Sequence, residues 1–319
     1  MITVLTGGTG GAKFVDGLRR LVAPEELTII VNTGDDHDWW GLHISPDIDS
    51  ILYTLAGMLS PERGWGVRGD TFHCLQAIKA LGEPAWFSVG DRDLATHLLR
   101  TQLLSQARTL TEATRIIGEK LGVRSRILPM TDQHVETRIH TPAGELSFQE
   151  YFVKRHSQDP INSVRFACSM DAKPAPGVID AITKAAAVLI APSNPITSIG
   201  PILAVPGIRY ALRQTEAKVV AVSPIVGNAA ISGPAAALMI SRDFAPSISG
   251  IADCYEDVLD ILVVDDSDAE SARSLHGRSV QFACTNIFLR TSEDRERVAR
   301  TTLELAFPEF QGTKLADAS

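Results

Sequence analysis

The first 31 residues carry the pattern that most restricts the fold. An apolar run at residues 1–6 leads into a glycine-rich segment, then a helical stretch at 14–21 and a second apolar run at 27–31. This order is a βαβ unit of the usual length, so a parallel sheet begins at the N-terminus. Further buried strands are expected at 187–190, 218–222 and 261–264, each beside an amphipathic helical segment. We therefore predict an α/β fold with a Rossmann-like doubly wound, mainly parallel sheet.

The middle of the chain has a different pattern of predicted secondary structure. Residues 46–123 contain almost no strand candidates, and helices are predicted at 47–59, 71–81, 91–105 and 111–121. Residues 134–152 alternate polar and apolar, which indicates an antiparallel hairpin. The predicted organisation is a Rossmann-like nucleotide-binding domain at 1–45 and 124–312, a small all-helical domain inserted at 46–123, and a disordered tail at 313–319.

Composition excludes several classes of protein. The chain has 319 residues, 45% of them hydrophobic, with no tract long enough to cross a membrane and no apolar leader before the first glycines. We therefore expect a cytoplasmic protein without a membrane partner. The four cysteines have no metal-ligand spacing and read as reduced thiols. A net charge of −8 argues against nucleic acid. A protein this acidic needs backbone amides, a few placed cations or a divalent metal to bind an anionic substrate.

The first glycine-rich segment predicts a phosphate or nucleotide contact. It lies between a strand and a helix, where backbone N–H groups and the helix dipole attract anions. It matches neither the P-loop nor the dinucleotide fingerprint, and a simple tight turn is the alternative. The candidate contacts are Gly7, Gly8, Thr9, Gly10, Gly11 and Lys13.

Residues 32–49 gather five aspartates and two tryptophans directly after a predicted strand. This combination favours a site for a metal-bound polyanion beside an aromatic ligand, over an acidic loop with two partly buried tryptophans. Ser45 and Pro46 resemble a helix start, with Ser45 as the cap. Asp47 and Asp49 then point some 200° apart around the helix, so one of them caps while the other turns inward with Asp35. Two carboxylates with water and phosphate are a usual Mg²⁺ shell.

Three further segments supply polar candidates. Residues 91–97 begin a helix, with a local ion pair as the plain explanation of their charges and His97 as a weak signal alone. The segments 191–201 and 223–234 follow predicted strands and mix rigid prolines with small hydroxyl and amide side chains, which can read a base edge or a ribose. Loops at the carboxyl ends of several strands favour one shared nucleotide cleft over independent turns.

These motifs resemble those of the 2-phospho-L-lactate transferase family. The resemblance rests on the segments 7–13, 32–36, 44–49, 90–97, 193–201 and 223–228, occurs in the family's order and spans about residues 2–290. The family acts in biosynthesis of the deazaflavin coenzyme F-420, and its actinobacterial members are called phosphoenolpyruvate transferases.

The resemblance implies a reaction, a cofactor and an assembly. A guanosine-diphosphate-linked three-carbon acid donates its phospho-acid to the terminal ribitol hydroxyl of the deazaflavin Fo, and GMP leaves. The family requires Mg²⁺ and is homodimeric. Asp35 and Asp49 match the expected metal-holding positions and are our catalytic candidates, with Asp49 preferred over His97 as the proton acceptor. The sequence does not distinguish phospholactate, phosphoenolpyruvate and 3-phosphoglycerate as the donor acid.

The site residues follow from these motifs. For the guanine nucleotide we expect the glycine-rich segment together with Ser193, Asn194, Ser198, Gly227 and Asn228. For Fo we expect Asp49, Ser88, Asp91, Arg92 and Trp39. Ser88 departs from archaeal members, which carry lysine there, so it offers only a hydroxyl or backbone group.

Two alternatives belong to other classes. A related family contains a gluconeogenesis-linked regulator that binds a UDP-sugar, but its acidic loop is rich in glycine and serine, unlike residues 35–41 here. An NAD-dependent oxidoreductase would need the dinucleotide fingerprint that the glycine segment lacks.

Overall fold

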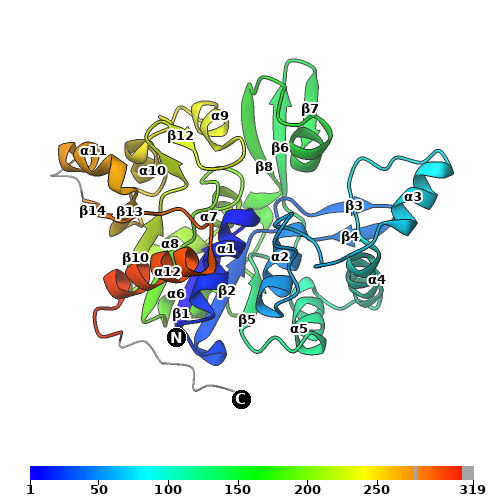
Figure 1. The fold of residues 1–319 in the computed structure, drawn as a ribbon, viewed down its shortest axis with the longest axis horizontal. Helices are drawn as coiled ribbons and strands as arrows, with labels where there is room; N and C mark the ends of the chain where they lie inside the picture. The colour runs from blue at the N-terminus through cyan, green and yellow to red at the C-terminus, as the bar shows by residue number, and fades with distance from the viewer. Residues whose placement is uncertain (276–278, 311–319) are drawn as a thin grey trace.

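A seven-stranded, fully parallel sheet forms the centre of the molecule. The structure is a computed structural model and describes residues 1–275 and 279–310. The strand order is β14-β13-β10-β9-β1-β2-β5 (Figure 1). The strands are β1 (Ile2–Thr6), β2 (Leu27–Val31), β5 (Arg126–Pro129), β9 (Ala187–Ile190), β10 (Lys218–Val222), β13 (Ile261–Val264) and β14 (Gln281–Cys284). The predicted doubly wound sheet is confirmed, although β5 and β14 were not among the predicted strands.

Both faces of the sheet are covered by helices. Alternate strand residues point to opposite faces, so Val4 of β1 belongs to the same hydrophobic core as Phe14 of one helical layer, and Leu5 belongs to the same core as Ile202 of the other. The first layer holds α1 (Gly8–Leu18), α2 (Pro46–Leu55) and α12 (Ser292–Ala306). The second holds α6 (Val178–Thr183), α7 (Gly200–Ala204), α8 (Ile208–Gln214), α9 (Ala235–Ile240) and α10 (Ile248–Cys254). Among the described residues, every helix is too short or too polar to cross a bilayer.

The strand order reverses between β1 and β9, which are neighbours in the sheet. The chain leaves β1 toward one helical layer and leaves β9 toward the other, so the segments that follow these two strands diverge. In open α/β sheets such a divergence opens a crevice at the carboxyl ends of the strands, where ligands bind. The fold therefore points to the segments after β1 and β9 as the walls of a site.

The segment between β2 and β5 contains the predicted helices. They are α2, α3 (His73–Ala80), α4 (Asp91–Ser105) and α5 (Leu110–Lys120). It also contains a hairpin that was not predicted, β3 (His37–Trp39) paired with β4 (Leu42–Ile44), which extends toward α3 at the right of Figure 1. Its two turn residues, Trp40 and Gly41, have φ values of 53° and 74°. A two-residue turn with both φ positive matches the twist of a hairpin.

A second sheet is antiparallel and has the order β7-β6-β8. The predicted hairpin is confirmed as β6 (Glu136–Thr141) and β7 (Gly144–Ser147), and β8 (Ser163–Ala167) adds a third strand. The predicted tail at 313–319 lies outside the described residues. The remaining elements are β11 (Ile225–Val226), β12 (Ala229–Ala230), α11 (Ala269–Ser274) and the short helical turns Pro24–Glu26, Glu150–Lys154, Ser169–Asp171 and Asp266–Asp268.

Candidate active site

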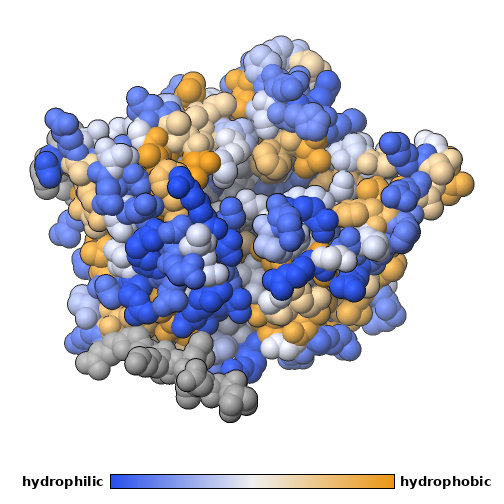
Figure 2. All heavy atoms as spheres, viewed as in Figure 1, coloured by the Kyte–Doolittle hydropathy of each residue, from blue (hydrophilic) through white to orange (hydrophobic). Residues whose placement is uncertain are grey.

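A cleft of about 380 Å³ lies where the strand order reverses, within the size range of small-molecule sites. Its walls come from the segments after β1, β2, β9 and β10, from α2 and α4, and from the turn after β7. Viewed as in Figure 1, the surface mixes hydrophilic and hydrophobic residues, and some of the hydrophobic ones lie below the antiparallel sheet (Figure 2). The expected nucleotide residues that line the cleft are Gly7, Gly8, Thr9, Gly10, Ser193, Asn194 and Ser198.

The glycine segment forms the first turn of α1 rather than a loop before it, because Gly7 is the N-cap and the helix begins at Gly8. Glycine is needed at these positions because neighbouring segments lie too close to the backbone for a side chain. A Cβ on Gly7 would lie 2.6 Å from Asp47 Oδ2, and a Cβ on Gly10 would lie 2.5 Å from the Pro192 carbonyl oxygen. The Ser193 hydroxyl donates to the Gly7 carbonyl at 2.7 Å, so the segments after β1 and β9 are joined at the cleft.

Four of the expected nucleotide residues do not line the cleft. Gly11 is buried against Thr6 and Ser193, and Lys13 lies one turn further along α1. The Gly227 amide donates to the carboxylate of Asp268, and Asn228 is exposed. The proline-rich segment after β10 reaches the cleft instead through Pro224 and residues 232–235.

Two buried carboxylates share one amide at the back of the cleft. Asn32 Nδ2 donates to Asp35 Oδ2 at 3.1 Å and to Asp47 Oδ2 at 2.9 Å. Asp47 also accepts from the Gly8 amide at 2.7 Å, whereas Asp35 Oδ1 is buried without a hydrogen-bond partner. Of the described residues that line the cleft, none is a lysine or arginine. This pair is therefore a place of uncompensated negative charge.

The pKa values of the pair reflect that imbalance. Burial, together with the neighbouring Asp47 carboxylate, raises the pKa of Asp35 well above its ordinary value. Burial raises the pKa of Asp47 to about 6, although hydrogen bonds from Asn32 and Gly8 oppose the shift. A cation placed between the two carboxylates would favour their charged forms and so oppose both shifts.

The carboxylate that neighbours Asp35 in the structure is that of Asp47. Asp47, not Asp49, shares the Asn32 amide with Asp35. Ser45 does not cap α2 with its side chain, because its hydroxyl donates to Asp36 at 2.7 Å. The expectation that Asp47 and Asp49 point in different directions holds, because Asp47 turns toward Asp35 and Asp49 turns toward Arg100. The metal role expected of Asp49 stays a prediction.

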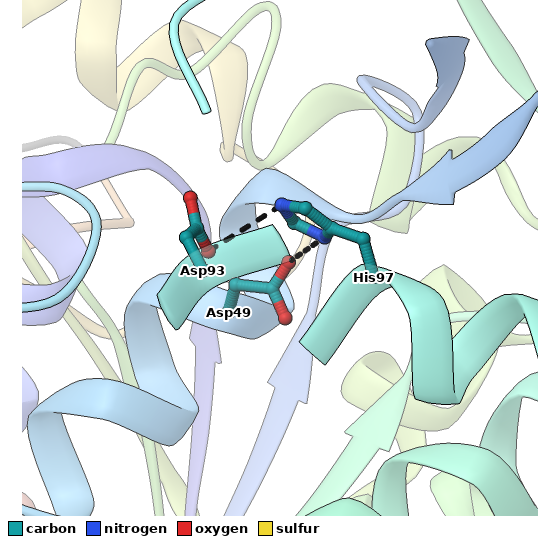
Figure 3. A group of neighbouring side chains, drawn as sticks. All are labelled: Asp49, Asp93 and His97. Carbon is teal, nitrogen blue, oxygen red and sulfur yellow. Dashed lines mark ion pairs between the residues drawn. The ribbon is translucent and has the colours of Figure 1, made fainter. Parts of the chain in front are cut away.

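Asp49 belongs to a separate buried network at the junction of α2 and α4. Arg100 Nη1 donates to Asp49 Oδ2 at 3.1 Å, and Arg100 Nη2 donates to Asp49 Oδ1. The His97 ring lies between two carboxylates, with Nδ1 3.5 Å from Asp49 Oδ2 and Nε2 3.4 Å from Asp93 Oδ1 (Figure 3). Tyr53 donates to Asp93 at 2.7 Å. Asp49, Asp93, His97 and Tyr53 all line the cleft, whereas Arg100 lies behind Asp49.

In the described part of the chain, one group of three or more His, Cys, Asp or Glu residues has possible metal-ligand atoms within 4.8 Å of one another. It consists of Asp49, Asp93 and His97. Arg100 already supplies a positive charge to Asp49. Burial alone would raise the pKa of Asp93, but hydrogen bonds from His97 and Tyr53 and the charge of Arg100 hold that pKa below its ordinary value. Asp49 is paired with Arg100 and Asp93 accepts from Tyr53, so the chemistry of this group fits an internal polar network better than a metal site.

The residues expected at the deazaflavin divide into two sets. Ser88 lines the cleft with Asp49. Asp91 instead accepts from the His73 and Cys74 amides at the start of α3, and Arg92 is exposed. Trp39 is buried behind Phe87 and packs edge-on against Trp86, with ring centroids 4.7 Å apart. Asp91, Arg92 and Trp39 therefore lie outside the cleft wall.

The aromatic wall of the cleft was not predicted. It consists of Trp65, Phe87, Phe148 and Phe152. The Phe148 and Phe152 rings are stacked at 5.5 Å with an interplanar angle of 7°, on the turn that follows β7. Their spacing of four residues was a usable helical signal, but only the fold shows that this turn reaches the cleft.

Comparison with known proteins places the chain in a family. The model of the family described as 2-phospho-L-lactate transferase CofD matches residues 2–297. The chain is 42% identical to a 2-phospho-L-lactate transferase of Methanococcoides burtonii, over 91% of this chain and 94% of the relative. It is 39% identical to a phosphoenolpyruvate transferase of Streptomyces coelicolor, over 96% and 98%.

Among solved structures, a UPF0052 family protein of Bacillus halodurans shares the fold. Two structures of it align with TM-scores of 0.63 and 0.65 at 21% and 20% identity, covering 95% of this chain and 99% of theirs. Fold, cleft and relatives together define an α/β transferase. The chain belongs to the 2-phospho-L-lactate transferase CofD family.

Proposed function

We propose that the protein transfers a phospho-acid from a guanosine-diphosphate-linked donor to the terminal ribitol hydroxyl of the deazaflavin Fo, releasing GMP, as a step of coenzyme F-420 biosynthesis. The observation that carries the proposal is the composition of the cleft. The start of helix α1, several aromatic rings and two uncompensated carboxylates all line it. Relatives named for both the phospholactate and the phosphoenolpyruvate reaction support this reaction class.

The carboxylate pair fits a divalent cation. Asp35 and Asp47 are both buried, Asp35 has an unpartnered oxygen, and a diphosphate brought beside them would add further negative charge. Mg²⁺, a hard cation that prefers oxygen ligands, would be held by Asp35 and Asp47 in this proposal, and Asp47 takes the metal role first predicted for Asp49. When bound, Mg²⁺ would neutralise the diphosphate and polarise the phosphorus under attack.

The protein's own groups bind and orient the two substrates. The first-turn amides of α1 that follow Gly8, whose own amide donates to Asp47, are proposed to hold the guanine nucleotide together with the Ser193, Asn194 and Ser198 side chains. Phe87, Phe148 and Phe152 offer flat apolar surface for the deazaflavin ring. Asp49 is proposed to accept a hydrogen bond from the attacking ribitol hydroxyl and so to orient it. A homodimer remains part of the proposal.

We expect the cleft to prefer GDP over ADP. Base-reading groups that are buried by the ligand remain unpaired when the base is wrong, and this lowers affinity strongly. Isothermal titration calorimetry with both nucleotides in Mg²⁺ measures the preference, and Ser198→Ala should weaken GDP binding by a few-fold to about ten-fold. Asn228→Ala, exposed and outside the cleft wall, is the matched control and should leave GDP affinity unchanged. Equal affinity for ADP and GDP would refute the base-reading role.

A further inference from the structure

Arg100 is fully buried, and both of its terminal nitrogens donate to one carboxylate, with Nη1 also 3.4 Å from His97 Nδ1. It extends from α4 to Asp49 on α2 and donates to both carboxylate oxygens. Such a two-point contact fixes the plane of a carboxylate as well as its position. Asp49 lines the cleft but Arg100 does not, so the guanidinium orients a cleft residue without reaching the ligand space.

The stability of the folded protein is a weak explanation for the buried Arg100–Asp49 pair. A buried ion pair gives little net stabilisation, because removing both charges from water offsets their attraction. The Arg100–Asp49 pair has a specific effect on the cleft, where Asp35 and Asp47 already carry uncompensated negative charge. Without Arg100, Asp49 would add a third such carboxylate, free to rotate and repelling an anionic donor.

We propose that Arg100 is a positioning residue that holds the Asp49 carboxylate in one orientation toward the attacking hydroxyl of the acceptor. This inference rests on the proposed function. Arg100 contacts neither substrate, and its effect passes through Asp49. Lysine would keep the charge but cannot reproduce the two-point contact, since its ammonium is a single point donor.

A double-mutant cycle tests this role. We expect Arg100→Lys to lower kcat by about 10-fold to 100-fold, as a small misplacement of a reacting group does, with the KM for the donor within about three-fold of wild type. In the Asp49→Asn background the same substitution should cause no further loss of kcat, because the carboxylate it positions is gone. Arg295→Lys is the matched control, since Arg295 pairs with Asp16 at 3.0 Å on α12 and α1, away from the cleft.

The outcomes separate the two claims. If Arg100→Lys reduces kcat by the same factor with and without Asp49→Asn, Arg100 acts through the fold and the positioning role is wrong. Should thermal denaturation show that Arg100→Lys does not fold, Arg100→Gln combined with Asp49→Asn removes both charges of the pair. A kcat equal to that of Asp49→Asn alone then supports the role, and a further large loss overturns it. A wild-type protein without turnover contradicts the proposed function itself.

Discussion

Asp35→Asn should lower turnover by about two orders of magnitude or more and at the same time stabilise the metal-free protein at neutral pH. The loss of activity is expected because Asp35 is proposed to hold the cation that balances the substrate's charge, and removing such an electrostatic group has an effect of this size. The gain in stability is expected because Asp35 is a buried carboxylate with one unpartnered oxygen. Steady-state kinetics and thermal denaturation in EDTA measure the two effects.

The pH dependence of stability follows from the direction of the pKa shifts of Asp35 and Asp47. Burial raises the pKa of Asp35 and raises that of Asp47 to about 6, above the ordinary value of 3.8 in the unfolded chain. The folded state therefore binds more protons than the unfolded state above pH 4, and the metal-free protein should lose stability as pH rises toward 6 and beyond. Asp35→Asn should flatten this decline.

Added Mg²⁺ gives a readout that does not depend on turnover. It should raise the melting temperature of the wild-type protein, because a ligand that binds the folded state stabilises it, and should raise that of Asp35→Asn much less. Asp38→Asn is the control, since the Asp38 side chain is 85% exposed in the same segment. An Asp35→Asn variant with near-normal turnover would refute the assignment.

Gly10→Ala should weaken nucleotide binding by about ten-fold or more. A Cβ at this position meets the Pro192 backbone oxygen at 2.5 Å, so the segments after β1 and β9 must move apart. Overpacking of this kind costs about 1–3 kcal/mol when the neighbour is backbone. Gly118→Ala is the matched control, because Gly118 is also helical and its added Cβ would lie 3.4 Å from the end of the Leu52 side chain. GDP titration calorimetry compares the two variants, and equal affinities would mean that the junction does not shape the site.

The sheet could be predicted from sequence because its buried parallel strands are short apolar runs beside amphipathic helices. Residues 187–190, 218–222 and 261–264 form strands with the predicted bounds. The hairpin at residues 37–44 was not predicted, since its turn is Trp40-Gly41 and lacks a usual turn sequence.

The location of the site could be predicted from the sequence, but the partners of its carboxylates could not. Helical geometry showed that Asp47 and Asp49 diverge, but not which of them turns toward Asp35. That choice depends on Asn32 and Arg100, which come from β2's carboxyl end and from α4, and no local pattern brings these segments together. The same limit applies to Trp39, whose buried position is set by Trp86 and Phe87.

The central claim is the transfer reaction, and analysis of its products tests it most directly. The purified protein is incubated with Mg²⁺, Fo and each guanosine-diphosphate-linked acid in turn, and the mixture is resolved by liquid chromatography with mass spectrometry. We expect one GMP for each Fo converted to its phosphodiester with the donor acid, with the preferred donor identified by rate and with no product in EDTA. Fo left unmodified by the phospholactate, phosphoenolpyruvate and 3-phosphoglycerate donors, under conditions in which the protein binds GDP, would contradict the account.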